Sequence, residues 1–85
     1  MGHSSDSIAI DVCVFAGLRE RLGAGRLTVE VPVGATVSEV FARLFPAEAA
    51  QNFRVMFAVG QTYVSPQHVV AAGDEVALVP PLGGG

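Results

Sequence analysis

The feature that most restricts the fold is a single amphipathic helix in a chain otherwise built from strand-like segments. Thr36-Val37-Ser38-Glu39 is a capping-box sequence, which predicts that a helix begins here. Apolar residues then recur at helical spacing and form one stripe, at Val37, Val40, Phe41, Leu44 and Phe45. Pro46 is expected to end the helix. Since one helix can cover only one face of a sheet, the pattern predicts two layers.

Segments on both sides of this helix alternate between apolar and polar residues, as strands do. Residues 8–15 and 26–31 alternate strictly, and the glycines at 23 and 25 predict a reversal between them, hence an antiparallel hairpin. Residues 16–22 are expected to form a helical turn or a loop. After the helix, strands are predicted at 54–59, 62–64 and 75–79, separated by turns at Gly60-Gln61 and Gly73-Asp74.

The element order β-β-α-β-β-β predicts an α+β domain of the β-grasp, or ubiquitin-like, type. We expect a mixed sheet of four to five strands, covered on one face by one main helix and followed by a flexible C-terminal tail. The 85 residues suffice for one compact domain only. We expect residues 1–7 to be a disordered N-terminus or an expression remnant, residues 8–79 the β-grasp domain, and residues 80–85 an extended PPLGGG tail.

Composition excludes several classes of partner. The net charge is −3 and the chain has no lysine, so no nucleic-acid footprint is present. No apolar run approaches the roughly 20 residues of a membrane-spanning helix, so we expect no membrane contact. Cys13 is the only cysteine and no signal peptide is recognisable, which makes the cytoplasm the expected location.

Side chains that could perform catalysis are scarce. Cys13 falls within a predicted strand without an evident base, and is interpreted as a small sheet residue. His68 falls in a loop and is interpreted as a surface residue. The histidines, the cysteine and the carboxylates show none of the close spacings of metal sites. We therefore expect no bound metal or cofactor and no enzyme activity of the isolated chain.

The C-terminal segment Pro80-Pro81-Leu82-Gly83-Gly84-Gly85 is the part best suited to chemistry. The two prolines fix φ and remove two hydrogen-bond donors, so the tail should leave the sheet in an extended form. Glycines admit the backbone to a narrow channel, and no β-carbon shields the Gly85 carboxylate, so an activating enzyme could attach AMP there. Six extended residues reach about 20 Å. The alternative is a frayed terminus.

The sheet face opposite the helix is a candidate docking surface. If Ile8, Ile10 and their neighbours of equal parity face the helix, then Ala9, Cys13 and Phe15 face outward. By parity this open face also holds either Met56 with Ala58 or Val79 with Ala77. An apolar open face usually marks a docking site. The alternative is that the strand register or a loop buries these residues.

Three segments resemble one known family: Val14-Phe15-Ala16-x-x-Arg19-Glu20, Gly73-Asp74-Glu75-Val76-Ala77 and the PPLGGG tail. In their order and spacing they resemble the MoaD/ThiS-type sulfur carriers, most closely the small subunits of molybdopterin synthase. The resemblance implies a C-terminal glycine that is adenylated, converted to a thiocarboxylate, and used to deliver sulfur to cyclic pyranopterin monophosphate in molybdenum cofactor biosynthesis. Two departures are Leu78-Val79, where relatives often carry an aromatic residue, and Gly83, which replaces a common Ser, Thr or Ala.

The resemblance also implies roles for individual residues and partners. Gly85 would carry the reactive carboxylate or thiocarboxylate beside Gly84. The partners would be the large synthase subunit, an E1-like adenylyltransferase that uses ATP, and a sulfur donor protein. The partner-binding residues would be Phe15, Arg19, Val79, Pro80, Pro81, Leu82 and Gly83. Two alternatives stay open: a sulfur carrier for thiamine thiazole, cysteine or another product, and a β-grasp interaction module without sulfur transfer.

Overall fold

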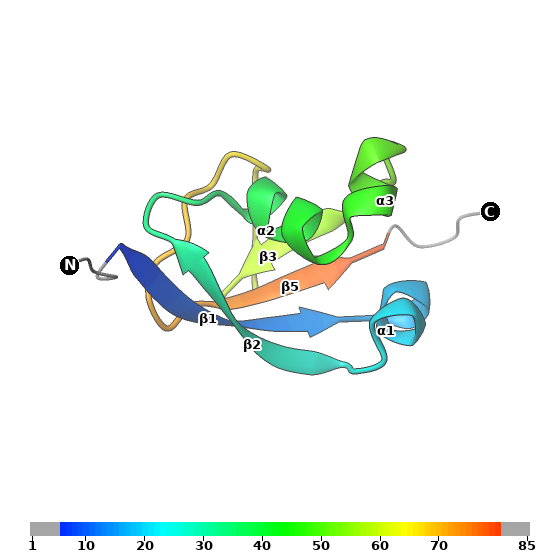
Figure 1. Ribbon diagram of the computed structural model, residues 1–85, viewed down its shortest axis with the longest axis horizontal. Helices are drawn as coiled ribbons and strands as arrows, with labels where there is room; N and C mark the ends of the chain where they lie inside the picture. The colour runs from blue at the N-terminus through cyan, green and yellow to red at the C-terminus, as the bar shows by residue number, and fades with distance from the viewer. Residues whose placement is uncertain (1–5, 81–85) are drawn as a thin grey trace.

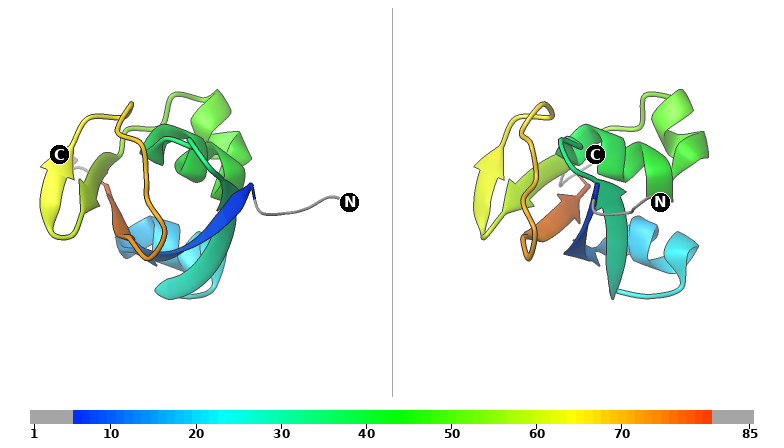
Figure 2. Two further views of the ribbon diagram at one scale, coloured as in Figure 1. Left: turned by 90° about the vertical axis from the view of Figure 1, so that its left-hand side faces the viewer. Right: turned by 60° about the vertical axis from the view of Figure 1, so that its left-hand side comes forward.

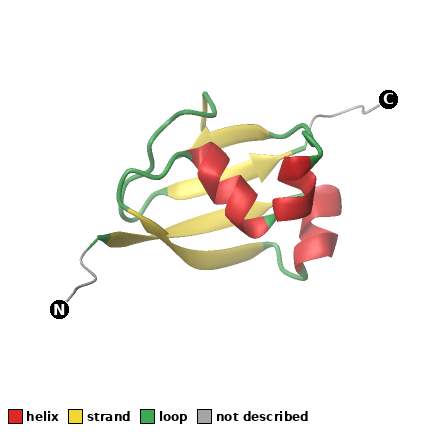
Figure 3. Cartoon of the chain, turned by 45° about the horizontal axis from the view of Figure 1, so that its top comes forward, coloured by secondary structure: helices red, strands yellow, loops and turns green. Residues whose placement is uncertain are grey.

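The predicted amphipathic helix lies across one face of a five-stranded sheet (Figures 1 and 3). The computed structural model describes residues 6–80. Its elements are β1 (Ser7–Val14), α1 (Ala16–Leu22), β2 (Arg26–Pro32), α2 (Val37–Leu44), α3 (Pro46–Ala50), β3 (Met56–Val59), β4 (Thr62–Val64) and β5 (Glu75–Val79). None of these helices is long and apolar enough to cross a membrane.

The strand order places the last strand in the middle of the sheet. The order is β2-β1-β5-β3-β4, in which β5 runs parallel to β1 and antiparallel to β3, while the β1–β2 and β3–β4 pairs are antiparallel. This mixed sheet, with α2 in the crossover between its two halves, confirms the predicted β-grasp arrangement. Since β5 is hydrogen-bonded on both sides, the chain leaves the sheet from its centre.

The core lies between α2 and the sheet. The twisted sheet curves around α2 in both views of Figure 2, and Phe41 of this helix contacts the rings of Phe45, Phe53 and Phe57. One continuous apolar cluster fills this layer: Ile10, Val12, Val14, Leu18, Val31, Ala35, Val37, Val40, Phe41, Phe45, Phe57, Val70, Val76 and Leu78. Val76 and Leu78 are fully buried, so packing as well as the hydrogen-bond ladder holds β5 in place.

The capping box at the start of α2 is present as predicted. The Thr36 hydroxyl accepts from the Glu39 amide at 3.2 Å, and the Glu39 carboxylate accepts from the Thr36 amide at 2.9 Å. The Gly60-Gln61 turn is also as expected, and both residues have positive φ, of 56° and 70°. This is the pattern of a two-residue type I′ turn, whose twist suits the β3–β4 hairpin.

Three local predictions needed correction. Pro46 does follow α2, but it also begins α3, because its fixed φ suits the first position of a helix. β2 and its register with β1 end at Pro32, although Val33 beyond it still donates to the Asp6 carbonyl at 2.7 Å. Alternate residues of β2 bond to β1, so the missing Pro32 donor faces the free edge of the sheet. The first strand begins at Ser7, one residue earlier than predicted, and β3 begins at Met56 rather than Arg54.

Candidate functional site

The root of the C-terminal tail is anchored by the central strand. Val79 ends β5, pairs in register with Met56, and is followed by the half-buried Pro80, the last residue that the structure describes. The remaining predicted tail residues, Pro81, Leu82, Gly83, Gly84 and Gly85, lie outside the described residues. The position from which they start is therefore set by the central strand of the sheet.

An apolar surface on the open face adjoins this root. We call it the docking face and define it as Phe15, Met56, Ala58, Tyr63, Ala77 and Val79. Phe15, Met56 and Tyr63 are 48%, 45% and 63% exposed, so nothing in the described part of the chain covers them. The two pairs that parity left as alternatives both lie here, because Met56 is opposite Val79 and Ala58 is opposite Ala77.

Phe15 reaches this face through its backbone conformation. It follows β1 with φ −132° and ψ 158°, so the alternation of the strand continues through it before α1 begins. Arg19 belongs to α1. Its side chain packs over Gly25 at the α1–β2 turn, where an added Cβ would lie 3.2 Å from the Arg19 Nε. The structure therefore brings Phe15, Val79 and Pro80 to one end of the sheet, and the turn beneath Arg19 lies at this same end, because the Val14 amide donates to the Gly25 carbonyl at 3.0 Å.

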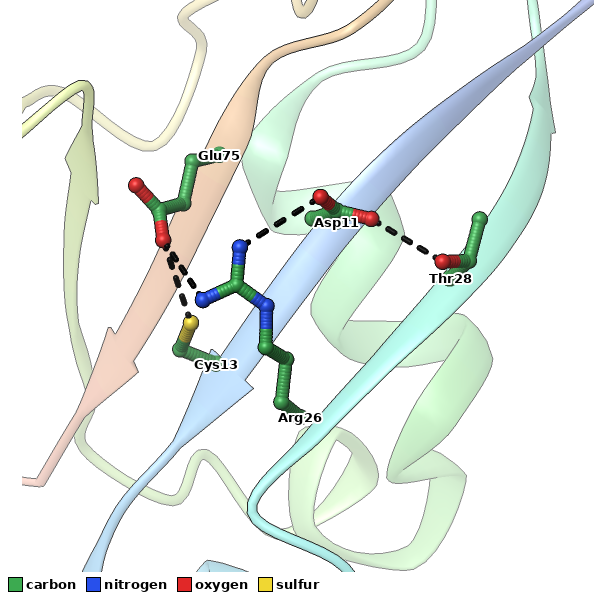
Figure 4. A network of polar contacts seen from close by, with 5 residues as sticks. All are labelled: Asp11, Cys13, Arg26, Thr28 and Glu75. Carbon is green, nitrogen blue, oxygen red and sulfur yellow. Dashed lines mark hydrogen bonds and ion pairs between the residues drawn. The ribbon is translucent and has the colours of Figure 1, made fainter.

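A group of polar side chains borders the docking face further along the strands (Figure 4). We call Asp11, Cys13, Arg26, Thr28 and Glu75 the polar bridge. The Arg26 guanidinium reaches from β2 over β1 to Glu75 of β5 at 3.0 Å, and it also contacts Asp11 at 3.4 Å. Asp11 accepts from the Thr28 hydroxyl at 2.9 Å, and the Cys13 thiol donates to Glu75 at 3.7 Å.

Sequence reasoning missed the polar bridge. All five side chains project from positions of their strands that face away from α2. The opposite charges on neighbouring strands were a signal that could have suggested the polar bridge. Cys13 is opposite Ala77 in the register, so the polar bridge and the docking face are contiguous.

Among residues 6–80 no histidine is hydrogen-bonded to Cys13, the one cysteine of the sequence. His68 lies in the loop before β5, and its carbonyl accepts from the Val37 amide at the start of α2. Cys13 lies on the opposite side of the sheet from α2, with a carboxylate as its polar neighbour. Among residues 6–80 no group of three or more His, Cys, Asp or Glu residues could hold a metal ion.

Cys13 is expected to react slowly as a nucleophile. Burial raises the pKa of its thiol, and Glu75 and Asp11 add to this rise while Arg26 opposes it. The native chain at pH 8 should therefore react with iodoacetamide more slowly than the same chain in urea. The thiol pKa is higher in the folded than in the unfolded state, so the protonated Cys13 thiol favours the folded state at neutral pH. This contribution to the free energy of unfolding is lost as the pH rises through the folded-state pKa. Equal alkylation rates in the two states would contradict this assignment.

Comparison with known proteins identifies the family. A model of the ThiS family matches residues 12–85. The chain belongs to the ThiS family. The molybdopterin synthase sulfur carrier subunit of Chlamydomonas reinhardtii is 40% identical over 81 residues, which cover 89% of this chain and 98% of that protein. The corresponding subunit of Arabidopsis thaliana is 32% identical over 84 residues, which cover 95% and 88%. The predicted MoaD/ThiS-type resemblance is confirmed.

Solved structures agree with the β-grasp assignment. SAMP1 from Haloferax volcanii superposes with a TM-score of 0.72 at 27% identity, over 91% of this chain and 99% of that one. The complex of subunits 1 and 2 of the molybdopterin-converting factor from Helicobacter pylori contains a chain that superposes with a TM-score of 0.60 at 17% identity, over 92% and 100%. At that identity the second likeness concerns the fold alone. A sulfur-carrier role follows from the ThiS family and its curated relatives.

Proposed function

We propose that this ThiS-family chain is the sulfur carrier subunit of molybdopterin synthase. The observation that carries the proposal is the position of the tail root: Val79 and Pro80 leave the central strand directly beside the uncovered docking face. A partner that covers this face would receive the tail at a fixed place. Relatives that match this chain over most of their own length bear the name of this carrier subunit, which supports the same assignment here.

In this proposal Gly85 carries the reacting group and the partners supply the energy. Its carboxylate attacks the α-phosphorus of ATP held by an E1-like adenylyltransferase, and pyrophosphate leaves. Hydrosulfide supplied by a sulfur donor protein then attacks the acyl carbon of this adenylate and AMP leaves, which gives the thiocarboxylate. This chain binds neither ATP nor another cofactor, and it is not an enzyme by itself. A sulfur tethered through Gly84 and Gly85 reaches cyclic pyranopterin monophosphate without diffusing away.

The large synthase subunit is the proposed partner of the docking face. Ordering the tail in a channel of that subunit costs conformational entropy, which contacts made by the globular domain must offset. Phe15, Met56 and Tyr63 offer exposed apolar area for such contacts. The Helicobacter pylori neighbour is itself part of a complex between subunits 1 and 2, which supports a partner of this kind.

Sulfur loading tests the proposal directly. The purified chain is incubated with an E1-like adenylyltransferase, ATP and a sulfur donor, and its intact mass is then measured. We expect the mass to rise by the difference between sulfur and oxygen, and to stay constant when ATP is omitted. No gain in mass by the wild-type chain with an active adenylyltransferase would refute the carrier role. The alternative destinations, such as thiamine thiazole, share this loading step and differ in the protein that receives the carrier.

A further inference from the structure

The polar bridge limits which partner surface can cover the docking face. Both of its contacts to Glu75, from the Arg26 guanidinium and from the Cys13 thiol, end on Oε2 of the carboxylate. The described part of the chain gives the other oxygen, Oε1, no hydrogen-bond partner. The bridge also holds two carboxylates against one guanidinium, which leaves one negative charge in excess.

This excess charge is accessible before a partner binds. The Asp11 and Glu75 side chains are each 43% exposed, so their remaining acceptor sites are open to water in the free domain. Ala77 of the docking face is opposite Cys13 and lies two residues from Glu75 on β5. A partner seated on Ala77 and Tyr63 must therefore extend over or beside the polar bridge. An apolar partner surface there would leave a carboxylate oxygen unpaired and desolvated, which is strongly unfavourable.

Building on the carrier function above, we propose that the large synthase subunit presents an arginine or lysine to Glu75 and Asp11. Glu75 and Val79 are four residues apart on β5, a separation of about 13 Å along the strand. The partner surface is therefore apolar, with a cation about 13 Å from the place where it receives Pro80. Apolar contacts near Val79 and a charge pair near Glu75 allow the partner to dock in one orientation only. In that orientation the tail points into the channel of the large subunit.

Two substitutions of opposite sign test this proposal. Glu75→Gln removes the excess negative charge, and we expect association with the purified large subunit at low salt to be about fivefold slower and less salt-dependent. Arg26→Gln doubles the excess negative charge, and we expect faster association at low salt. Glu30→Gln, on the outer strand opposite Ala9, is the matched control and should change the rate little. Amide spectra and thermal unfolding of each variant establish that it is folded.

A purely structural bridge predicts a different result. Glu75→Gln and Arg26→Gln would then slow association to the same extent, or neither would change it. Either outcome would overturn the proposal that the partner presents an arginine or lysine to Glu75 and Asp11. The sulfur carrier function would still stand in that case, because sulfur loading and wild-type binding would be intact. If the wild-type chain loads no sulfur and does not bind the large subunit, the proposed function fails as well. The association rates and the loading assay thus separate the two failures.

Discussion

Deletion of Gly84 and Gly85 is expected to abolish sulfur loading while the domain stays folded. The shortened chain still ends in a glycine, Gly83, so its carboxylate remains unhindered. What it loses is about 7 Å of reach, which takes the carboxylate out of a buried adenylation site. Its thermal unfolding should match that of the wild type, because the buried residues of β5, Val76 and Leu78, are unchanged.

A second variant separates reach from crowding at the terminus. Gly85→Ala keeps the full length but places a β-carbon next to the carboxylate, so we expect slower loading rather than none. Intact mass after a fixed time with adenylyltransferase, ATP and sulfur donor measures both variants beside the wild type. Loading of the deleted chain at the wild-type rate would contradict the role assigned to the two glycines.

Phe15→Asp should weaken binding to the large subunit by about 2 kcal/mol or more, roughly thirtyfold in Kd. Phe15 is 48% exposed and lies on the docking face beside the tail root, so a carboxylate there would be desolvated on docking. The free domain should lose little stability, because the residue is not part of the core. Binding of the purified large subunit can be measured by calorimetry.

The matched control for this substitution is Val33→Asp. Val33 is 61% exposed and apolar, but it belongs to the loop before α2, on the helix side of the sheet. The same change in charge there should leave the affinity within about twofold if the docking face is assigned correctly. Equal weakening by both substitutions would indicate a general effect of charge, and no weakening by Phe15→Asp would show that the partner binds another surface.

The fold could be predicted because its signals are local. The capping box at Thr36, the stripe of α2 and the alternation of β1 each depend on residues that are close in sequence. The short helix α3 was missed because Pro46 was interpreted as the end of one helix and not also as the first residue of another. Its PAEAA sequence, rich in good helix formers, was the available signal.

The site was only partly predictable because it depends on strand register. The outward parity of Phe15 and Cys13 follows from β1 alone, whereas only the register of β3 against β5 shows that the Met56 and Val79 pairs both lie on this face. The contact between Cys13 and Glu75 joins residues 62 positions apart, through the parallel β1–β5 pair. Alternation within a strand indicates which side chains share a face, but not which strands are neighbours.

The most direct test of the account is a single turnover of sulfur transfer. The thiocarboxylated chain is mixed with the large subunit and cyclic pyranopterin monophosphate, and the masses of the carrier and the pterin are followed together. We expect the carrier to return to its carboxylate mass as the pterin gains sulfur, in equal amounts and only when the large subunit is present. Persistence of the thiocarboxylate with an active large subunit, or release of sulfur at the same rate without that subunit, would contradict the account.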